Sequence, residues 1–172
     1  NRLLMQTRTS KKKLYSLHAP EADCISKGKA HKRYEYGVKV GIVATSKQGW
    51  VLSAEAYHGN PYDGHTLSDN LTAAISNIGI KPKQAFVDLG YRGHDESRVE
   101  VYHSRQKRGV TPSIKRWIKR RSAIEPIIGH MKQSHGLGKC RFKGKVGDQI
   151  NALLAAIGYN LSLIFNRLTP TA

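Results

Sequence analysis

The sequence predicts one mixed α/β domain in which helices cover a sheet. Three features predict this class: apolar residues alternate across 34–44 as in a strand, apolar residues recur with helical spacing across 67–78, and a short apolar run ends at Asp88. The chain has 172 residues, which is enough for one substantial core and short for two.

The first predicted elements are two strands joined by a turn. Alternate residues from Tyr34 to Ala44 would share one face of a strand, and residues 50–57 resume an extended apolar run. Between them, the sequence SKQG at 46–49 supplies residues that are typical of turns. The pair therefore indicates a hairpin.

A helix is predicted next, after the loop-like stretch 58–66. Thr66 followed by Asp69 three positions later resembles a capping pair, and Gly79 lies where a C-terminal cap would. Five apolar residues have the spacing of one buried helical face: Leu67, Leu71, Ala74, Ile75 and Ile78.

Two strands and two helices are predicted in the second half. Residues 84–88 indicate a buried strand with Asp88 at its C-terminal tip, and 98–104 indicate a further strand. Helices are predicted from 114 to about 135 and from 148 to 168. We interpret the apolar stripe of the last helix as core, with an oligomer interface as the alternative; it comprises Ile150, Leu153, Leu154, Ile157, Leu161, Ile164 and Phe165.

The charge predicts a polyanionic partner. Lysine and arginine number 29 against 12 aspartates and glutamates, giving a net charge of +17 and a pI near 10.1. Nucleic acid is favoured over a membrane surface because no basic amphipathic segment dominates. Candidate backbone contacts form a helical cluster and a second basic stretch at 138–145, although the cluster is also compatible with a solvated face; the cluster comprises Lys115, Arg116, Lys119, Arg120 and Arg121.

No stretch approaches the ~18 apolar residues that a membrane span needs, and no secretory signal is evident, so we expect a cytoplasmic protein. The two cysteines are too few for a disulfide framework. A zinc site built from His130, His135 and Cys140 is disfavoured because close pairing of the ligands is missing.

Two carboxylates are candidates for chemistry. On a continuous helix, Arg121, Glu125 and Lys132 fall within about 40° of one another, at the border of an apolar face. Glu125 has an alternative interpretation as a capping partner of Ser122, and Asp88 has one as an ordinary turn residue. In a basic chain, however, acids that hold Mg²⁺ ions would serve phosphodiester chemistry, which becomes the leading class.

Four stretches carry a resemblance to a known family. They are RSAIEPIIGHMK at 121–132, FVDLGYRG at 86–93, HGNPYDGHTL at 58–67 and the stretch 15–41. The chain resembles the C-terminal portion of a bacterial insertion-sequence DDE transposase. The order Arg, three residues, Glu, six residues, Lys is similar to the third catalytic motif of that family, although the family's usual tyrosine is replaced by Ile118.

The resemblance implies an RNase H-like, retroviral-integrase-like mixed sheet flanked by helices. It implies DNA cleavage and joining, with Asp88 and Glu125 as catalytic acids that bind Mg²⁺ or Mn²⁺, two ions in all. Transposon ends and target DNA would be the partners of a homo-oligomer associated with the bacterial nucleoid. The expected DNA contacts are Arg121, Lys132, Lys119, Arg120, Arg141 and Lys143. A non-catalytic nucleic-acid-binding module and an RNase H-like nuclease remain as alternatives.

One departure from the family concerns its first aspartate, which lies on the first core strand. Residues 1–20 contain no Asp or Glu, and Glu21 and Asp23 lie beside Pro20 outside any convincing strand. We therefore expect the first acid to precede Asn1. On this interpretation 1–13 is a basic linker or tail, 14–172 is the C-terminal part of the catalytic domain, and the segment alone is inactive.

Overall fold

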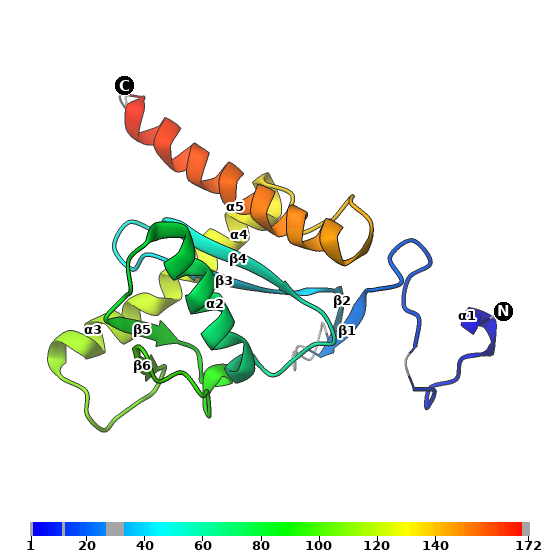
Figure 1. Ribbon diagram of the computed structural model, residues 1–172, viewed down its shortest axis with the longest axis horizontal. Coiled ribbons are helices and arrows are strands. Elements are labelled where there is room, and N and C mark those ends of the chain that lie inside the picture. Colours follow the sequence, from blue (N-terminus) through cyan, green and yellow to red (C-terminus); the bar gives the residue numbers. More distant parts are fainter. Residues whose placement is uncertain (1, 12, 27–32, 170–172) are drawn as a thin grey trace.

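The computed structural model describes residues 2–11, 13–26 and 33–169. The mixed α/β class is confirmed, with strands and helices arranged as in Figure 1. In chain order the elements are α1 (Arg2–Met5), β1 (Asp23–Ser26), β2 (Tyr34–Gly37), β3 (Lys39–Ala44), β4 (Val51–Tyr57), α2 (Asp63–Ile78), β5 (Gln84–Val87), the 3-10 turn η1 (Leu89–Tyr91), β6 (Glu100–His103), α3 (Pro112–Arg120), the 3-10 turn η2 (Arg121–Ala123), α4 (Ile124–Ser134) and α5 (Gly144–Leu168).

The described strands form three separate pairs in place of the single expected sheet. β1 and β2 are antiparallel, β3 and β4 are antiparallel, and β5 and β6 are parallel. The two larger layers around them come from α2 on one side and from α3, α4 and α5 on the other. The middle layer is therefore split between β3 and β5.

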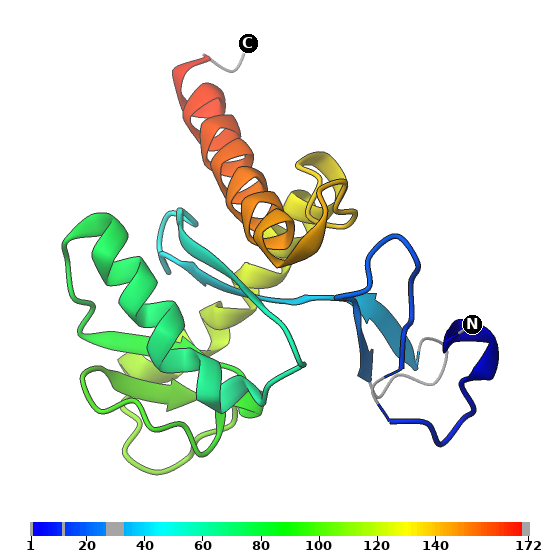
Figure 2. The same ribbon diagram turned by 45° about the vertical axis from the view of Figure 1, so that its right-hand side comes forward.

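The predicted strand over 34–44 is interrupted at Gly37. The φ angle of Gly37 is 150°, which side-chain-bearing residues rarely adopt, so β2 ends there and β3 begins at Lys39. Tyr34 and Tyr36 are consequently exposed on a hairpin that stands away from the main body (Figure 2), whereas Ile42 packs against the core. The alternating pattern is real but belongs to two different sheets.

The predicted hairpin of β3 and β4 is confirmed, with Lys39 opposite Tyr57. The helix after it was expected to begin near Thr66, but α2 begins at Asp63. The Thr66 hydroxyl donates to the carbonyl of Asp63 at 2.8 Å, so the predicted capping pair is wrong. The predicted end is correct, because Gly79 caps α2 in the left-handed conformation with φ of 68°.

The strands predicted at 84–88 and 98–104 are both present, as β5 and β6. Their parallel pairing sets Val87 opposite His103, which brings the residues that follow both strands together. The apolar residues of β5 alternate between two neighbours. Ala85 and Val87 pack with α2, and Phe86 stacks on Tyr102, with ring centroids 5.6 Å apart.

The continuous helix predicted from 114 to about 135 is interrupted. The 3-10 turn η2 separates α3 from α4, so the break precedes Pro126. Pro126 lies in the first turn of α4, where a missing backbone N–H removes no helical hydrogen bond. On the core side of α4, Ile127 and Met131 are buried as expected.

The last helix has the predicted period but buries the opposite face. α5 packs against β4 and α4 through Ala152, Ala155, Ala156 and Tyr159, because small side chains allow a close approach. The larger apolar residues, which we expected in the core, are exposed instead. Although α5 is long, no helix in the described residues combines the length and apolar character that a membrane crossing requires.

Candidate active site

Asp88 stands at the point where β5 ends and η1 begins. One oxygen of its carboxylate, Oδ1, accepts hydrogen bonds from the Leu89 amide at 2.9 Å and the Ser104 hydroxyl at 3.0 Å. Ser104 follows β6, so the parallel pairing of β5 and β6 brings it to Asp88. Burial alone would raise the pKa of Asp88, but these hydrogen bonds and the charges of Arg121 and Arg105 hold it below its ordinary value.

Glu125 lies in the first turn of α4 and is exposed. The partial positive charge at a helix N-terminus favours a carboxylate in this position. The alternative interpretation, a capping box with Ser122, is wrong: α4 begins after Ala123 with no side-chain cap, and the Ser122 hydroxyl donates to the Lys119 carbonyl at 3.1 Å. The carboxylate of Glu125 is therefore not used for capping.

Arg121 joins the two acids. Its Nη1 lies 3.9 Å from Asp88 Oδ2, and its Nη2 lies 3.4 Å from Glu125 Oε1. The arginine side chain is 19% exposed, whereas those of Asp88 and Glu125 are 62% and 67% exposed. Two acids from a strand tip and a helix thus face one cation, with most of their carboxylate surface open to solvent. The exposed carboxylates of Asp88 and Glu125 attract cations to this position.

Asp88 and Glu125 provide two of the ligands that a hard cation would need. Carboxylate oxygens are the ligands that Mg²⁺ and Mn²⁺ prefer, and Asp88 and Glu125 supply them from two rigid elements. Across the described residues, however, no three His, Cys, Asp or Glu side chains gather closely enough to hold a metal ion. That finding gives no support to a zinc site at His130, His135 and Cys140 either.

Asp63 and Glu21 support loops. Asp63 Oδ1 pairs with Lys39 Nζ at 2.9 Å, and its other oxygen lies against Gly90, where a methyl group would come within 2.6 Å of it. Asp63 therefore braces the turn that follows Asp88. Glu21 accepts a hydrogen bond from the amide of Gly144 at 2.9 Å, which ties it to the residues just before α5.

Asp23 begins β1, so the expectation that it lies outside a strand is wrong. Its carboxylate accepts a hydrogen bond from the amide of Gly59 at 2.6 Å. Neither Glu21 nor Asp23 has a contact that links it to Asp88 or Glu125 among the described interactions. The alternative in which one of them serves as the first acid gains no support from this geometry.

The predicted DNA contacts include exposed side chains and one arginine, Arg120, that also holds the fold together. Lys119 and Lys132 are exposed on α3 and α4, and Arg141 and Lys143 are exposed just before α5. Arg120 has a second role that the sequence did not reveal. Its guanidinium donates to the carbonyls of Ser46 at 2.7 Å and Lys47 at 3.0 Å, which ties α3 to the β3–β4 turn.

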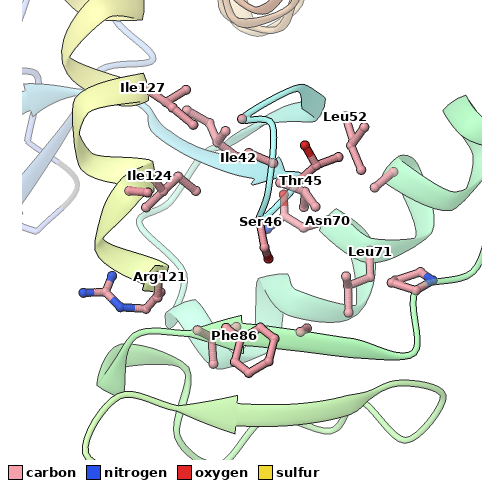
Figure 3. A pocket seen from close by; sticks show the side chains of 18 of the residues that line it. Ile42, Thr45, Ser46, Leu52, Asn70, Leu71, Phe86, Arg121, Ile124 and Ile127 are labelled. Atoms are coloured by element: carbon pink, nitrogen blue, oxygen red, sulfur yellow. The ribbon is translucent and has the colours of Figure 1, made fainter. Parts of the chain in front are cut away.

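A cavity of about 850 Å³ lies beside the two acids, and no local pattern in the sequence predicted it. Figure 3 shows its walls: Ile42 from β3, Leu71 from α2, Phe86 from β5 and Ile124 from α4, with Arg121 at one end. In the described part of the chain β3 pairs only with β4, and β5 pairs only with β6. Each of these strands therefore has an unpaired edge, and both line the cavity.

Asn70 stands in the cavity wall on α2 and is only 2% exposed. Its Oδ1 accepts no hydrogen bond from any residue that the structure describes. The side chain lies against Gly41 of β3, where a Cβ atom would come within 2.4 Å of it. A buried acceptor without a donor is costly, so a donor within the cavity would stabilise the Asn70 side chain.

Comparison with known proteins gave one match. A family model described as "Transposase DDE domain" matches residues 7–161, which includes Asp88, Glu125 and the cavity between β3 and β5. No curated protein and no solved structure matches the chain.

Proposed function

The chain belongs to the family of transposase DDE domains, and on that premise we propose that it cleaves and joins DNA strands at the ends of a bacterial insertion sequence. The observation that carries this proposal is the meeting of Asp88 and Glu125 around one guanidinium. A capping acid and an ordinary turn acid would have no reason to converge on the same cation.

The two acids are proposed to hold Mg²⁺ or Mn²⁺ as part of a two-ion site. Bound there, such ions would activate water or a 3′-hydroxyl for attack on phosphorus and stabilise the leaving oxygen. Asp88 is ready for this role near neutral pH, because its lowered pKa keeps the carboxylate ionised. Arg121 can exchange its carboxylate partners for a phosphate, which its planar donors fit equally well.

The third acid of the site is proposed to arrive on an extended strand that fills the cavity. Four observations support it: the unpaired edges of β3 and β5, the apolar walls, the partnerless Oδ1 of Asn70 and the size of the void. Protein interiors leave few voids larger than a water molecule. A strand there would direct alternate side chains toward α2 and α4, and so would be apolar on both faces.

We place that strand, with the first acid, ahead of Asn1. Residues 1–13 would then link it to the rest of the catalytic domain at 14–172. Without it, two carboxylates leave a pair of metal ions with too few ligands, so the 172-residue chain should not cleave DNA by itself.

The DNA would run along the basic side chains near the acids. Lys132 lies on α4 with Glu125, Arg121 and Lys119 lie on the preceding η2 and α3, and Arg141 and Lys143 precede α5. Contacts of this kind bind the phosphate backbone and carry no base specificity. Arg120 would contribute less, because its guanidinium already holds the β3–β4 turn.

The test replaces each acid in a protein that includes the preceding segment and cleaves DNA. We expect Asp88→Asn and Glu125→Gln each to reduce strand cleavage by at least about a thousandfold, with little change in DNA affinity measured by gel shift. Asp95 is an exposed acid in a loop, so Asp95→Asn is the matched control, and this variant should cleave DNA normally. Full cleavage by either site variant would end the proposal.

The same assay separates this function from its alternatives. A nuclease would cut the DNA ends but yield no joined product when a target duplex is added. A non-catalytic binding module would bind DNA with a steep salt dependence and yield neither product. Joined strands that disappear with Asp88→Asn are the result that the proposal predicts.

A further inference from the structure

A row of large apolar side chains runs along the exposed side of α5. We call it the α5 seam; its members are Ile150, Leu154, Ile157, Leu161, Ile164 and Leu168. They are between 41% and 77% exposed, although isoleucine and leucine are among the residues most often buried. Extended apolar rows of this kind on a protein surface mark interaction sites.

The spacing of the seam is that of a helix that packs on another helix. From Ile150 to Leu168 the steps alternate between four and three residues, which is the a/d pattern of a heptad repeat. The face that packs on the domain, with Ala152, Ala155 and Ala156, lies on the other side of α5. α5 therefore has two apolar faces, and the structure occupies one of them.

The seam lies in an uncharged part of the chain, so a second copy can approach it. No Lys, Arg, Asp or Glu occurs from 149 to 166, in a protein whose net charge is +17. Two copies would repel each other across most of their surfaces. Along the seam they can approach without placing like charges in contact.

The order of residue types makes the seam complementary to itself when reversed. About a centre between Ile157 and Leu161, Ile150 is matched with Leu168, and Leu154 is matched with Ile164. An antiparallel pair would thus set an isoleucine against a leucine in every layer. A parallel pair would stack leucine on leucine at a and isoleucine on isoleucine at d, an arrangement that shifts preference away from two strands.

α5 contacts the domain along most of its length. Gln149 and Asn160 bond to β4, and the Arg167 guanidinium lies 4.5 Å from the centroid of the Trp50 ring. These contacts leave the side chains of the seam exposed, so a partner helix can reach them along that length.

We propose that a second copy of this chain covers the α5 seam, with the two α5 helices antiparallel about a two-fold axis between Ile157 and Leu161. Such an interface is isologous, since the same residues contribute from both copies. The seam is about 27 Å long, so the contact lies at the small end of stable interfaces. We expect dissociation on the order of micromolar concentrations.

Sedimentation equilibrium of the 172-residue chain tests the pairing. The chain should change from monomer to dimer as its concentration rises, and Leu161→Asn should weaken dimerisation by at least about tenfold. Leu17→Asn is the matched control, because Leu17 is also exposed, at 74% against 58% for Leu161, but lies outside α5. Circular dichroism of the dilute variants would establish that both remain folded. A chain that stays monomeric to about 1 mM, or an unchanged dimer in Leu161→Asn, would overturn the proposal.

Disulfide trapping tests the orientation. In a Cys24→Ser, Cys140→Ser background, Ile157→Cys and Leu161→Cys chains are mixed and oxidised. The antiparallel pair predicts that the mixed disulfide between position 157 of one copy and position 161 of the other predominates. Efficient self-linking of either single variant, without the mixed product, would exclude the antiparallel arrangement.

Discussion

The two edges of the β3–β4 hairpin differ in whether their backbone groups have hydrogen-bond partners. At the outer edge, α5 supplies two side-chain amides in place of a neighbouring strand. Asn160 accepts from the Val51 amide at 3.0 Å and donates to the Val51 carbonyl at 2.8 Å. Gln149 accepts from the Ala56 amide at 2.8 Å and donates to the Ala54 carbonyl at 3.0 Å.

The inner edge, formed by β3, lines the 850 Å³ cavity instead, and Asp88 and Glu125 line the same cavity. Exposed strand edges promote unwanted pairing, and proteins usually block them. This chain blocks the edge that is remote from the acids and leaves open the edge beside them. The difference supports the proposal that the opening receives a specific strand.

The largest effect should come from opening the outer edge. Gln149→Ala combined with Asn160→Ala would leave four backbone groups of β4 without partners, which should lower the free energy of unfolding by about 3 kcal/mol or more. Denaturant unfolding would measure the loss. Asn166→Ala, an exposed amide on the same helix, should have little effect. A double variant as stable as this control would show that the outer edge is not sealed by these amides.

Hydrogen exchange should distinguish the two edges in the unmodified chain. The amides of Val51 and Ala56 should exchange only on global unfolding, because α5 must leave before they open. The cavity-facing amides of β3 and β5 should exchange at least about 100-fold faster. In a longer chain that carries the proposed strand, the second group should exchange as slowly as the first. Equal rates in the 172-residue chain would remove the contrast on which the strand proposal rests.

An ion pair between Arg98 and Glu96 holds the segment before β6 against α2, and its contribution to stability should depend on pH. Arg98 ties Glu96 to α2, with Nη2 2.7 Å from the Glu96 carboxylate and 3.1 Å from the Ser68 carbonyl. The hydrogen bond from Arg98 lowers the pKa of Glu96 from its ordinary 4.5, against the opposing effect of burial. The ion pair therefore contributes stability above that value and loses it as the pH falls through the lower, folded-state pKa.

Glu96→Gln should accordingly destabilise the protein at pH 7 by at most about 1 kcal/mol, since Arg98 remains partly in solvent. The difference from the unmodified chain should shrink as the pH falls below the ordinary pKa of 4.5 and the Glu96 carboxylate becomes protonated. Unfolding free energies measured across this range would check the sign. A difference that grew as the pH fell would contradict the assignment.

The smallest effect is expected at Asn70, on the inner side. Its Oδ1 has no donor among the described residues, so Asn70→Ala should change the free energy of unfolding by less than about 0.5 kcal/mol. Asn160→Ala, the same substitution at the outer edge, should cost about 2 kcal/mol. When the cavity is filled by its strand, Asn70→Ala should become destabilising. The Nδ2 of Asn70 donates a long hydrogen bond to the Thr66 hydroxyl, at 3.4 Å, which contributes little. A large loss in the 172-residue chain would mean that the Oδ1 of Asn70 already has a donor.

Local patterns predicted the parts of this fold that depend on neighbouring residues. The hairpin turn, the strand that ends at Asp88 and the cap at Gly79 each follow from a few adjacent residues. The spacing of four residues between Arg121 and Glu125 also predicted that their side chains lie on one side, and their ion pair follows from it although Arg121 belongs to η2 and Glu125 to α4.

The errors concern partners that are remote in sequence. The period of α5 was correct, but which face is buried depends on β4, which the pattern within α5 cannot indicate. Ser122 is an exception, because it fits a capping box and yet its hydroxyl donates to the Lys119 carbonyl only three residues earlier. The contact of Arg120 with Ser46 spans 74 positions, and the cavity requires four elements at once. Such features need the folded chain.

The central claim is that Asp88 and Glu125 form one divalent metal site, and paramagnetic NMR tests it most directly. Mn²⁺ titrated into the chain should broaden the amide signals of 87–90 and of 123–126 together, at the same metal concentration. Asp88→Asn or Glu125→Gln should each abolish the broadening of both segments. Broadening of one segment alone, or of both in either variant, would contradict the account.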